Sequence, residues 1–151
     1  MTGDVDQPYA GAWRGTTHHF ALRVYFEDTD TAGIVYYANY LKYMERARSD
    51  MLRSLGIDQR AVLERGGGVY VVTEAHIKYR GSAKLDDALL ALSTIEEVRG
   101  ASCVIHQRVM RGSAMLADAM ITAAFVAPDG RPKRQPRDWV ERFERLKREG
   151  A

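Results

Sequence analysis

The chain has 151 residues, of which 46% are hydrophobic and 28% charged, and its formal net charge is +2. A chain of this length folds most simply as one domain, and the small net charge does not suggest nucleic-acid binding. The single cysteine, Cys103, excludes an intramolecular disulfide framework and fits a reducing compartment. With no apolar run near the ~18 residues of a membrane helix and no secretory signal, we expect a cytoplasmic protein.

The N-terminal segment is rich in glycine, threonine and aspartate and shows no hydrophobic period. We therefore expect residues 1–17 to form a mostly disordered arm. A half-buried strand is predicted from His19 to Phe26, because every second residue there is apolar. We expect the globular domain to span residues 18–130.

A long amphipathic helix is predicted from Ala38 to Leu55, where apolar residues recur at intervals of three and four. Gly56 stands where a left-handed C-terminal cap is favoured. At ~1.5 Å per residue such a helix is about 27 Å long, enough to form the hydrophobic centre of a small domain. A short helical or irregular piece is expected from Asp58 to Glu64.

Four further strands are predicted between Val69 and Val126. In the first, Val71, Thr73, Ala75, Ile77 and Tyr79 are expected on one face. Short turns at residues 99–100 and 112–113 make the last three strands antiparallel neighbours. The predicted strands span residues 69–80, 88–98, 102–111 and 114–126.

Residues 131–151 are expected to form a basic tail that ends in a short amphipathic helix. Asp138 is predicted to cap that helix, with Glu141 three residues later as in a capping box. The cationic side chains have three interpretations: solvated charge, a site for an anionic ligand or partner, or contact with a membrane surface.

These elements predict an α+β fold in which a five-stranded antiparallel sheet curls around one long helix. The sheet would have open edges, which a dimer could pair into a continuous sheet.

The acidic turn before the long helix is the candidate for chemistry. It contains Glu27, Asp28 and Asp30, followed by Gly33. An aspartate there could simply cap the helix. A calcium loop fails, because Ala32 and Asn39 occupy ligand positions. A carboxylate facing a helix N-terminus could instead attack a carbonyl, or activate water, while helix N–H groups polarise that carbonyl.

The remaining reactive side chains favour structural roles. Cys103 lies within a predicted strand and fits a core residue better than a nucleophile. His76 and His106 are expected to be structural histidines. Glu45 is expected to pair at the surface with Arg48 or Ser49.

Residues 28–40, DTDTAGIVYYANY, resemble the 4-hydroxybenzoyl-CoA thioesterase family of hotdog-fold acyl-CoA thioesterases. The later stretches LKYMERARSDMLRSLG and YRGSAKLDD resemble its branch associated with the Tol-Pal system. The resemblance covers roughly Ala21 to Pro132. It implies the hotdog fold, dimers and often tetramers, and active sites at subunit interfaces.

By position, the resemblance makes Asp30 the catalytic carboxylate and the backbone N–H of Tyr37 the donor to the thioester carbonyl. It places Gly33, Ile34 and Val35 at the entrance to the acyl pocket. We expect no metal and no cofactor, with coenzyme A entering only as part of the substrate. This branch usually has histidine at position 37, where this chain has tyrosine, but a backbone N–H donor does not depend on the side chain.

Basic side chains are expected to bind the phosphates of coenzyme A, and the candidates are Arg80, Lys84 and residues 131–134. Three functions remain open. The first is hydrolysis of an acyl-CoA or acyl-carrier-protein thioester. The second is a hotdog hydratase or dehydratase, in which His76 or His106 would have to reach Asp30. The third is a non-catalytic module that binds an acyl thioester or a partner in an envelope complex.

Overall fold

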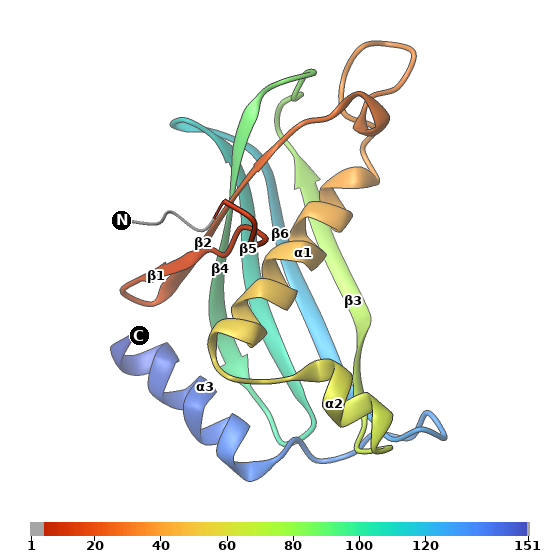
Figure 1. Ribbon diagram of the computed structural model, residues 1–151, viewed down its shortest axis with the longest axis vertical. Coiled ribbons are helices and arrows are strands. Elements are labelled where there is room, and N and C mark those ends of the chain that lie inside the picture. Colours follow the sequence, from red (N-terminus) through yellow and green to blue (C-terminus); the bar gives the residue numbers. More distant parts are fainter. Residues whose placement is uncertain (1–4, 151) are drawn as a thin grey trace.

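A computed structural model describes residues 5–150 as one sheet with a long helix across one face (Figure 1). The helices are α1 (Asn39–Ser54), α2 (Gln59–Glu64) and α3 (Arg137–Glu149), with a 3-10 turn, η1, at Phe26–Asp28. The α+β class and the wrapped sheet agree with the fold predicted from the sequence. No helix among residues 5–150 is long and apolar enough to cross a membrane.

The sheet has six strands in the order β1-β2-β4-β5-β6-β3, and all neighbours are antiparallel. The strands are β1 (Ala12–Arg14), β2 (Thr17–Arg23), β3 (Val69–Tyr79), β4 (Ala88–Val98), β5 (Ser102–Arg111) and β6 (Ala114–Val126). The predicted bounds of the last three strands are confirmed.

Strand β1 was not predicted and lies within the expected disordered arm. It pairs with β2, with Ala12 opposite His19 and Arg14 opposite Thr17. Just before it, the Gly11 N–H donates to Asp50 of α1 at 2.9 Å. Disorder is therefore the wrong prediction for these residues, because a short hairpin and a contact with α1 hold them. The first four residues of the expected arm lie outside the described part of the chain.

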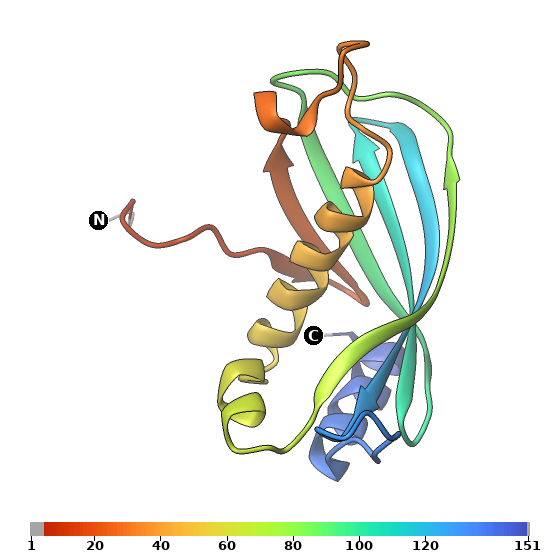
Figure 2. The same ribbon diagram turned by 90° about the vertical axis from the view of Figure 1, so that its right-hand side faces the viewer.

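Helix α1 crosses the concave face of the sheet, as Figure 2 shows from the side. Its predicted bounds are correct to within one residue at each end. Gly56 has φ +77°, and the next residue, Ile57, donates to the Leu52 carbonyl. This is the αL ending expected at a C-terminal glycine.

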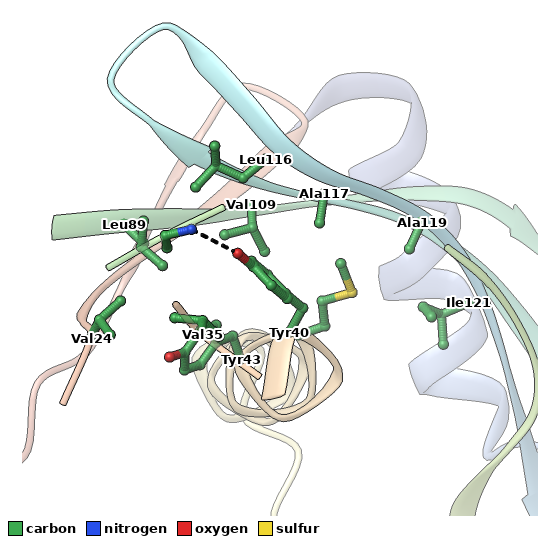
Figure 3. Packing of buried hydrophobic residues seen from close by; sticks show 12 residues of the cluster. Val24, Val35, Tyr40, Tyr43, Leu89, Val109, Leu116, Ala117, Ala119 and Ile121 are labelled. Carbon is green, nitrogen blue, oxygen red and sulfur yellow. Dashed lines mark hydrogen bonds between the residues drawn. The ribbon is translucent and has the colours of Figure 1, made fainter. Parts of the chain in front are cut away.

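The hydrophobic core consists of two clusters, and the upper cluster in Figure 1 packs the first half of α1 against the sheet. Tyr40, Tyr43 and Met44 of α1 are buried against small and branched residues of the strands (Figure 3). The Tyr40 hydroxyl points at the sheet and accepts a hydrogen bond from the Ala83 N–H at 3.1 Å. Buried polar atoms are costly unless they are hydrogen-bonded, so this contact fixes the first turns of α1 relative to the sheet.

Helix α3 covers the second hydrophobic cluster, at the lower end of the sheet in Figure 1. Trp139, Phe143 and Leu146 are buried against α1 and the lower ends of the strands. The predicted capping box is wrong: the helix begins at Arg137 after Pro136, and the Asp138 carboxylate accepts from Arg142. Part of the expected basic tail is therefore an integral layer of the fold.

Strand β3 forms the long open edge of the sheet. A β-bulge between Val72 and Glu74 shifts its register, and this shift overturns the predicted single apolar face. Tyr70, before the bulge, and Ile77, after it, both pack against the hydrophobic core. The side chains of Val71 and Val72 are left exposed.

Candidate active site

The acidic turn doubles back on itself between η1 and α1. Thr29 and Val35 form an antiparallel bridge, and the Asp30 N–H donates to the Ile34 carbonyl at 2.9 Å. Gly33 makes the reversal possible because its φ of +81° lies in the left-handed region. The result is a small hairpin that carries Asp30 and is tied to the start of α1 through the bonds from Tyr36 and Asn39 to the Asp28 carbonyl.

Asp30 has one carboxylate oxygen that is not hydrogen-bonded within residues 5–150. Its side chain is half-buried, and Oδ1 accepts from the Ala32 N–H at 2.9 Å. Within residues 5–150, Oδ2 has no hydrogen-bond donor. Neither Asp30 nor Asp28 caps α1, because the N-cap residue is Ala38 and it receives no side-chain hydrogen bond. The capping alternative for this turn is therefore wrong.

Asp28 holds the turn together. It is buried, and its carboxylate accepts from the Tyr25 N–H at 2.8 Å. Its backbone carbonyl accepts from the Tyr36 N–H at 3.0 Å and from Nδ2 of Asn39 at 2.8 Å. Burial, followed by the nearby Asp28 carboxylate, raises the pKa of the Tyr43 hydroxyl.

Sequence reasoning missed the role of Asn39. This residue was considered only as a failed calcium ligand, yet its side chain ties the first residue of α1 to the acidic turn. An asparagine at the start of a helix was the available signal, since such residues often bond nearby backbone groups.

The start of α1 leaves two N–H groups without an acceptor. The N–H groups of Asn39, Tyr40 and Leu41 bond to the carbonyls of residues 36–38. Those of Tyr37 and Ala38 find no acceptor in the described part of the chain. Unpaired donors at a helix N-terminus carry partial positive charge, so they can stabilise a developing oxyanion.

Aromatic rings line the mouth of this region. The Tyr37 ring contacts those of Tyr36 and Tyr79, with centroids 5.0 and 5.7 Å apart, and Tyr79 also contacts Tyr40. Tyr36, Tyr37 and Tyr79 are all substantially exposed. The tyrosine that stands at the usual histidine position thus belongs to an aromatic surface.

The other predicted site residues separate into two groups. Ile34 bridges Lys84, and the buried Val35 donates its N–H to Ala83, so these residues lie beside Gly33 and Asp30. Arg80 is near Lys84 in sequence, but its Nη2 forms an ion pair with Oδ2 of Asp118 at 3.9 Å. Residues 131–134 lie at the opposite end of the sheet, where Lys133 donates to the Gly67 carbonyl (Figure 1).

His76 and His106 lie on the sheet face away from α1. His106 Nε2 is 2.6 Å from Asp118, and His76 is paired with Glu74. His76 and His106 share a register row through Met120 on that outer face. Neither side chain can reach Asp30, which lies on the helix side of the sheet. The dehydratase hypothesis required one of these histidines as a base, so this structure does not support it.

Cys103 is a core residue, as expected. Burial raises the pKa of its thiol to about 12, and Sγ lies 3.3 Å from the Gln135 oxygen.

A single antiparallel sheet wrapped around one helix, with a free carboxylate beside unpaired helix N–H groups, defines the class of hotdog-fold enzymes. The chain belongs to the thioesterase superfamily, whose family model matches residues 32–117. The sequence-based resemblance to hotdog-fold thioesterases is therefore confirmed, although the sheet has six strands and not five.

Named relatives support this assignment. The chain is 44% identical over 107 residues to "Acyl-CoA thioesterase YbgC" of Haemophilus influenzae, covering 71% of this chain and 79% of that protein. A probable thioesterase from Bartonella henselae has a TM-score of 0.75 at 35% identity, covering 80% of this chain and 99% of its own. The 4-hydroxybenzoyl-CoA thioesterase of Pseudomonas sp. strain CBS-3 has a TM-score of 0.75 at 27% identity, covering 83% and 98%.

Proposed function

We propose that the chain hydrolyses acyl-CoA thioesters to the free acid and coenzyme A. The observation that carries this proposal is the pairing of Asp30, which has an unbonded oxygen, with the unpaired N–H groups of Tyr37 and Ala38. Relatives named as acyl-CoA thioesterases support the same chemistry.

The thioester carbonyl oxygen accepts a hydrogen bond from the Tyr37 N–H, which stabilises the negative charge of the tetrahedral intermediate. Asp30 either takes a proton from the attacking water or attacks the carbonyl carbon itself. In both routes the C–S bond breaks and coenzyme A leaves as a thiolate. In the second route, water then cleaves the acyl-aspartate anhydride. Each route consumes one water and yields one acid and one thiol.

The substrate lies along the hairpin. Gly33 lets the ligand approach the backbone, and Ile34 and Val35 border the entrance for the acyl group. Lys84, bridged to Ile34, binds a coenzyme A phosphate, with Arg80 as a second cation that must leave Asp118 to do so. The reaction draws on protein groups alone, without a metal or a cofactor other than the coenzyme A of the substrate.

The working form is a homo-oligomer in which the open edge of β3 pairs with the same edge of a second copy. The resemblance extends this dimer to a tetramer, adds acyl carrier protein as an alternative thiol carrier, and links the chain to the Tol-Pal system. Cytoplasmic location is supported by the lone, buried Cys103, which suits a reducing compartment.

The deciding experiment measures thiol release from a panel of short, long and aromatic acyl-CoAs, and from acyl carrier protein carrying the best acyl group. We expect hydrolysis of at least one class. Saturable binding without thiol release across the whole panel would contradict the proposal and favour the non-catalytic binding module.

A further inference from the structure

Lys84 is a cation without an acidic partner close to the candidate site. It is exposed and forms no ion pair within residues 5–150. Its backbone bridges Ile34, whose carbonyl accepts from the Asp30 N–H at 2.9 Å. Paired residues of an antiparallel bridge have Cα atoms about 5 Å apart, so two short steps join Lys84 to Asp30. The four-carbon stem of the lysine gives its ammonium group further reach.

Two arginines on neighbouring elements are bonded within the chain. Arg80, just after β3, forms an ion pair with Asp118 at 3.9 Å. Arg48, in the middle of α1, donates to Gln107 at 2.9 Å and forms no hydrogen bond or ion pair with Glu45. This finding corrects the surface pair expected for that acid. Neither arginine offers the same free charge beside the hairpin.

The backbone that carries Lys84 is held on its inner side by the candidate site itself. Residues 81–87, here called the 81–87 turn, join β3 to β4 at the upper end of the molecule (Figure 2). The Ala83 carbonyl accepts from the Val35 N–H at 2.9 Å, and the Ala83 N–H donates to the Tyr40 hydroxyl at 3.1 Å. The 81–87 turn is therefore tied both to the hairpin and to α1.

Arg111 of β5 holds the outer side of the 81–87 turn. Its Nη1 donates to the Ser82 carbonyl and to Oδ2 of Asp87, each at 2.9 Å. The same Oδ2 accepts from the Lys84 N–H at 2.9 Å. These bonds, first that from the Lys84 N–H and then that from Arg111, hold the pKa of the Asp87 carboxyl below its usual range. Arg111 is thus linked to the Lys84 backbone through one ionised carboxylate.

The 81–87 turn also contains strained backbone. Asp86 has a φ of +71°, and it is the one non-glycine residue with a positive φ among residues 5–150. Its carbonyl accepts from Arg23 at 2.8 Å, and its N–H donates to the Val24 carbonyl at 3.0 Å. A backbone strained in this way persists where surrounding bonds enforce it, and such positions cluster at ligand-binding sites.

We propose that the 81–87 turn binds the phosphate group next to the pantetheine arm of the substrate, with Lys84 as the contacting cation and Arg111 as a positioning residue that acts through Asp87. The inference deepens the proposed function and rests on it. This phosphate is the first one along the arm from the thioester, and coenzyme A and acyl carrier protein both carry it. Because the turn is already held in one shape, little freedom is lost on binding.

The test compares thioesters of one acyl group on pantetheine, on phosphopantetheine and on coenzyme A. We expect kcat/KM to rise about 5- to 10-fold from the first to the second, as one ion pair with a phosphate allows, and to rise less from the second to the third. Equal values for the first two would overturn the inference. Absence of hydrolysis of all three would instead contradict the proposed function.

Lys84→Gln removes the contacting charge. We expect the ratio of kcat/KM for the phosphopantetheine thioester to that for the pantetheine thioester to fall to near one. Lys42→Gln is the matched control, because Lys42 is an exposed lysine of α1 without an ion pair in the described chain, and its ratio should stay at the wild-type value. An equal fall in both variants would mean diffuse attraction and would overturn the site.

The acid of the turn gives a variant of opposite sign. Asp86→Asn removes a negative charge near the lysine, and asparagine tolerates a left-handed φ, so the ratio should rise. Acyl-CoA and acyl carrier protein with the same acyl group then serve as paired substrates for Lys84→Gln. We expect both to lose the same factor in kcat/KM, and a loss confined to one carrier would overturn the assignment to their shared phosphate.

Arg111→Gln tests the positioning role, and it should lower the same ratio. Because Arg111 acts through Lys84, the double variant Lys84→Gln/Arg111→Gln should have the ratio of Lys84→Gln alone. A further fall in the double variant would overturn the positioning role. Arg111→Lys keeps the charge toward Asp87, so it should recover part of the lost ratio, and it replaces Arg111→Gln in the cycle if that variant does not fold.

Binding without turnover gives an independent measurement of the phosphate site. Calorimetric titration of the wild-type chain should give a dissociation constant for phosphopantetheine about 5- to 10-fold below that for pantetheine. The difference should vanish in Lys84→Gln and persist in Lys42→Gln. Equal dissociation constants in the wild type would overturn the inference, whatever the outcome of the thiol-release assays.

Discussion

Asn39 donates from Nδ2 to the backbone carbonyl of Asp28 across 2.8 Å, joining the first residue of α1 to the acidic turn. The same carbonyl accepts from the Tyr36 N–H. Two donors on one carbonyl hold the hairpin that carries Asp30 against the helix end that carries the Tyr37 N–H. The geometry of the candidate site therefore depends on a residue that need not touch the substrate.

We expect Asn39→Asp to lower kcat about 10- to 100-fold, because the carboxylate cannot donate to the Asp28 carbonyl and small displacements of catalytic groups are costly. Loss of one hydrogen bond should reduce the free energy of unfolding by only about 1 kcal/mol. Steady-state thiol release and urea denaturation measure the two effects. Wild-type kcat in this variant would show that the bond does not position the site.

Asp30→Asn should abolish most hydrolysis, with a fall in kcat of at least ~10²-fold, because an amide is neither a base nor a nucleophile. The fold should survive, since the half-buried side chain makes one local bond that an amide oxygen can also accept. Glu27→Gln is the control from the same turn and should retain activity. Near-normal turnover in Asp30→Asn would remove this residue from the mechanism.

Gly33→Ala separates backbone strain from steric clash. No heavy atom lies within 4 Å of the position that a Cβ would occupy, but φ is +81°, which costs a residue with a side chain about 1–2 kcal/mol. We expect a melting temperature lower by roughly 2–8 °C and reduced kcat, because the hairpin distorts next to Asp30. Gly100→Ala, without a left-handed φ, should change neither value.

Stability should decline in mild acid because of His18. Burial lowers the pKa of this side chain from its usual 6.5, and the pull of Asp50, whose Oδ2 lies 2.9 Å from Nε2, offsets only part of that shift. Below about pH 6.5 the unfolded chain therefore binds a proton that the folded chain resists. The free energy of unfolding should fall from pH 7 down through the lowered pKa.

The comparison variant for this pH effect is His18→Gln. Denaturation at a series of pH values should give a flatter profile below pH 6.5 for the variant than for the wild type. Superimposable slopes would assign the acid sensitivity to other groups, such as His19, whose pKa burial also lowers.

Phe143→Ala should destabilise the domain by about 3–5 kcal/mol, since it opens a cavity where α3 covers the second hydrophobic cluster. Arg145→Ala, on the exposed side of the same helix, should cost less than about 0.5 kcal/mol. Thermal melts compare the two variants. Equal, small effects would mean that the C-terminal segment is an appendage of the domain.

The sequence was informative where local pattern and tertiary packing agree. Residues 38–55 carry one apolar stripe, and that stripe is the face of α1 that the sheet covers. Strands β4, β5 and β6 alternate over most of their length and are joined by short turns, and their bounds were predicted correctly. Asp30 was distinguished from Asp28 only by the family resemblance, and the structure supplies the physical difference: Asp28 is buried and bonded.

Other features depend on contacts that no local pattern carries. Strand β1 exists because of its pairing with β2 and the bond from Gly11 to Asp50. The bulge at Val72–Glu74 breaks the alternation of β3 so that Tyr70 and Ile77 can both face inward. Asp138 resembles a helix cap, yet α3 already begins at Arg137, with Pro136 at the N-cap position.

The two edges of the sheet differ in length, and this difference limits how large an assembly can grow. At one edge β1 offers a ladder of three residues, whereas at the other β3 offers eleven. A sheet that could extend at both edges would add copies without end and form a fibre. Each copy has one long open edge, so the proposed association through the sheet would stop at two copies, with both long edges paired.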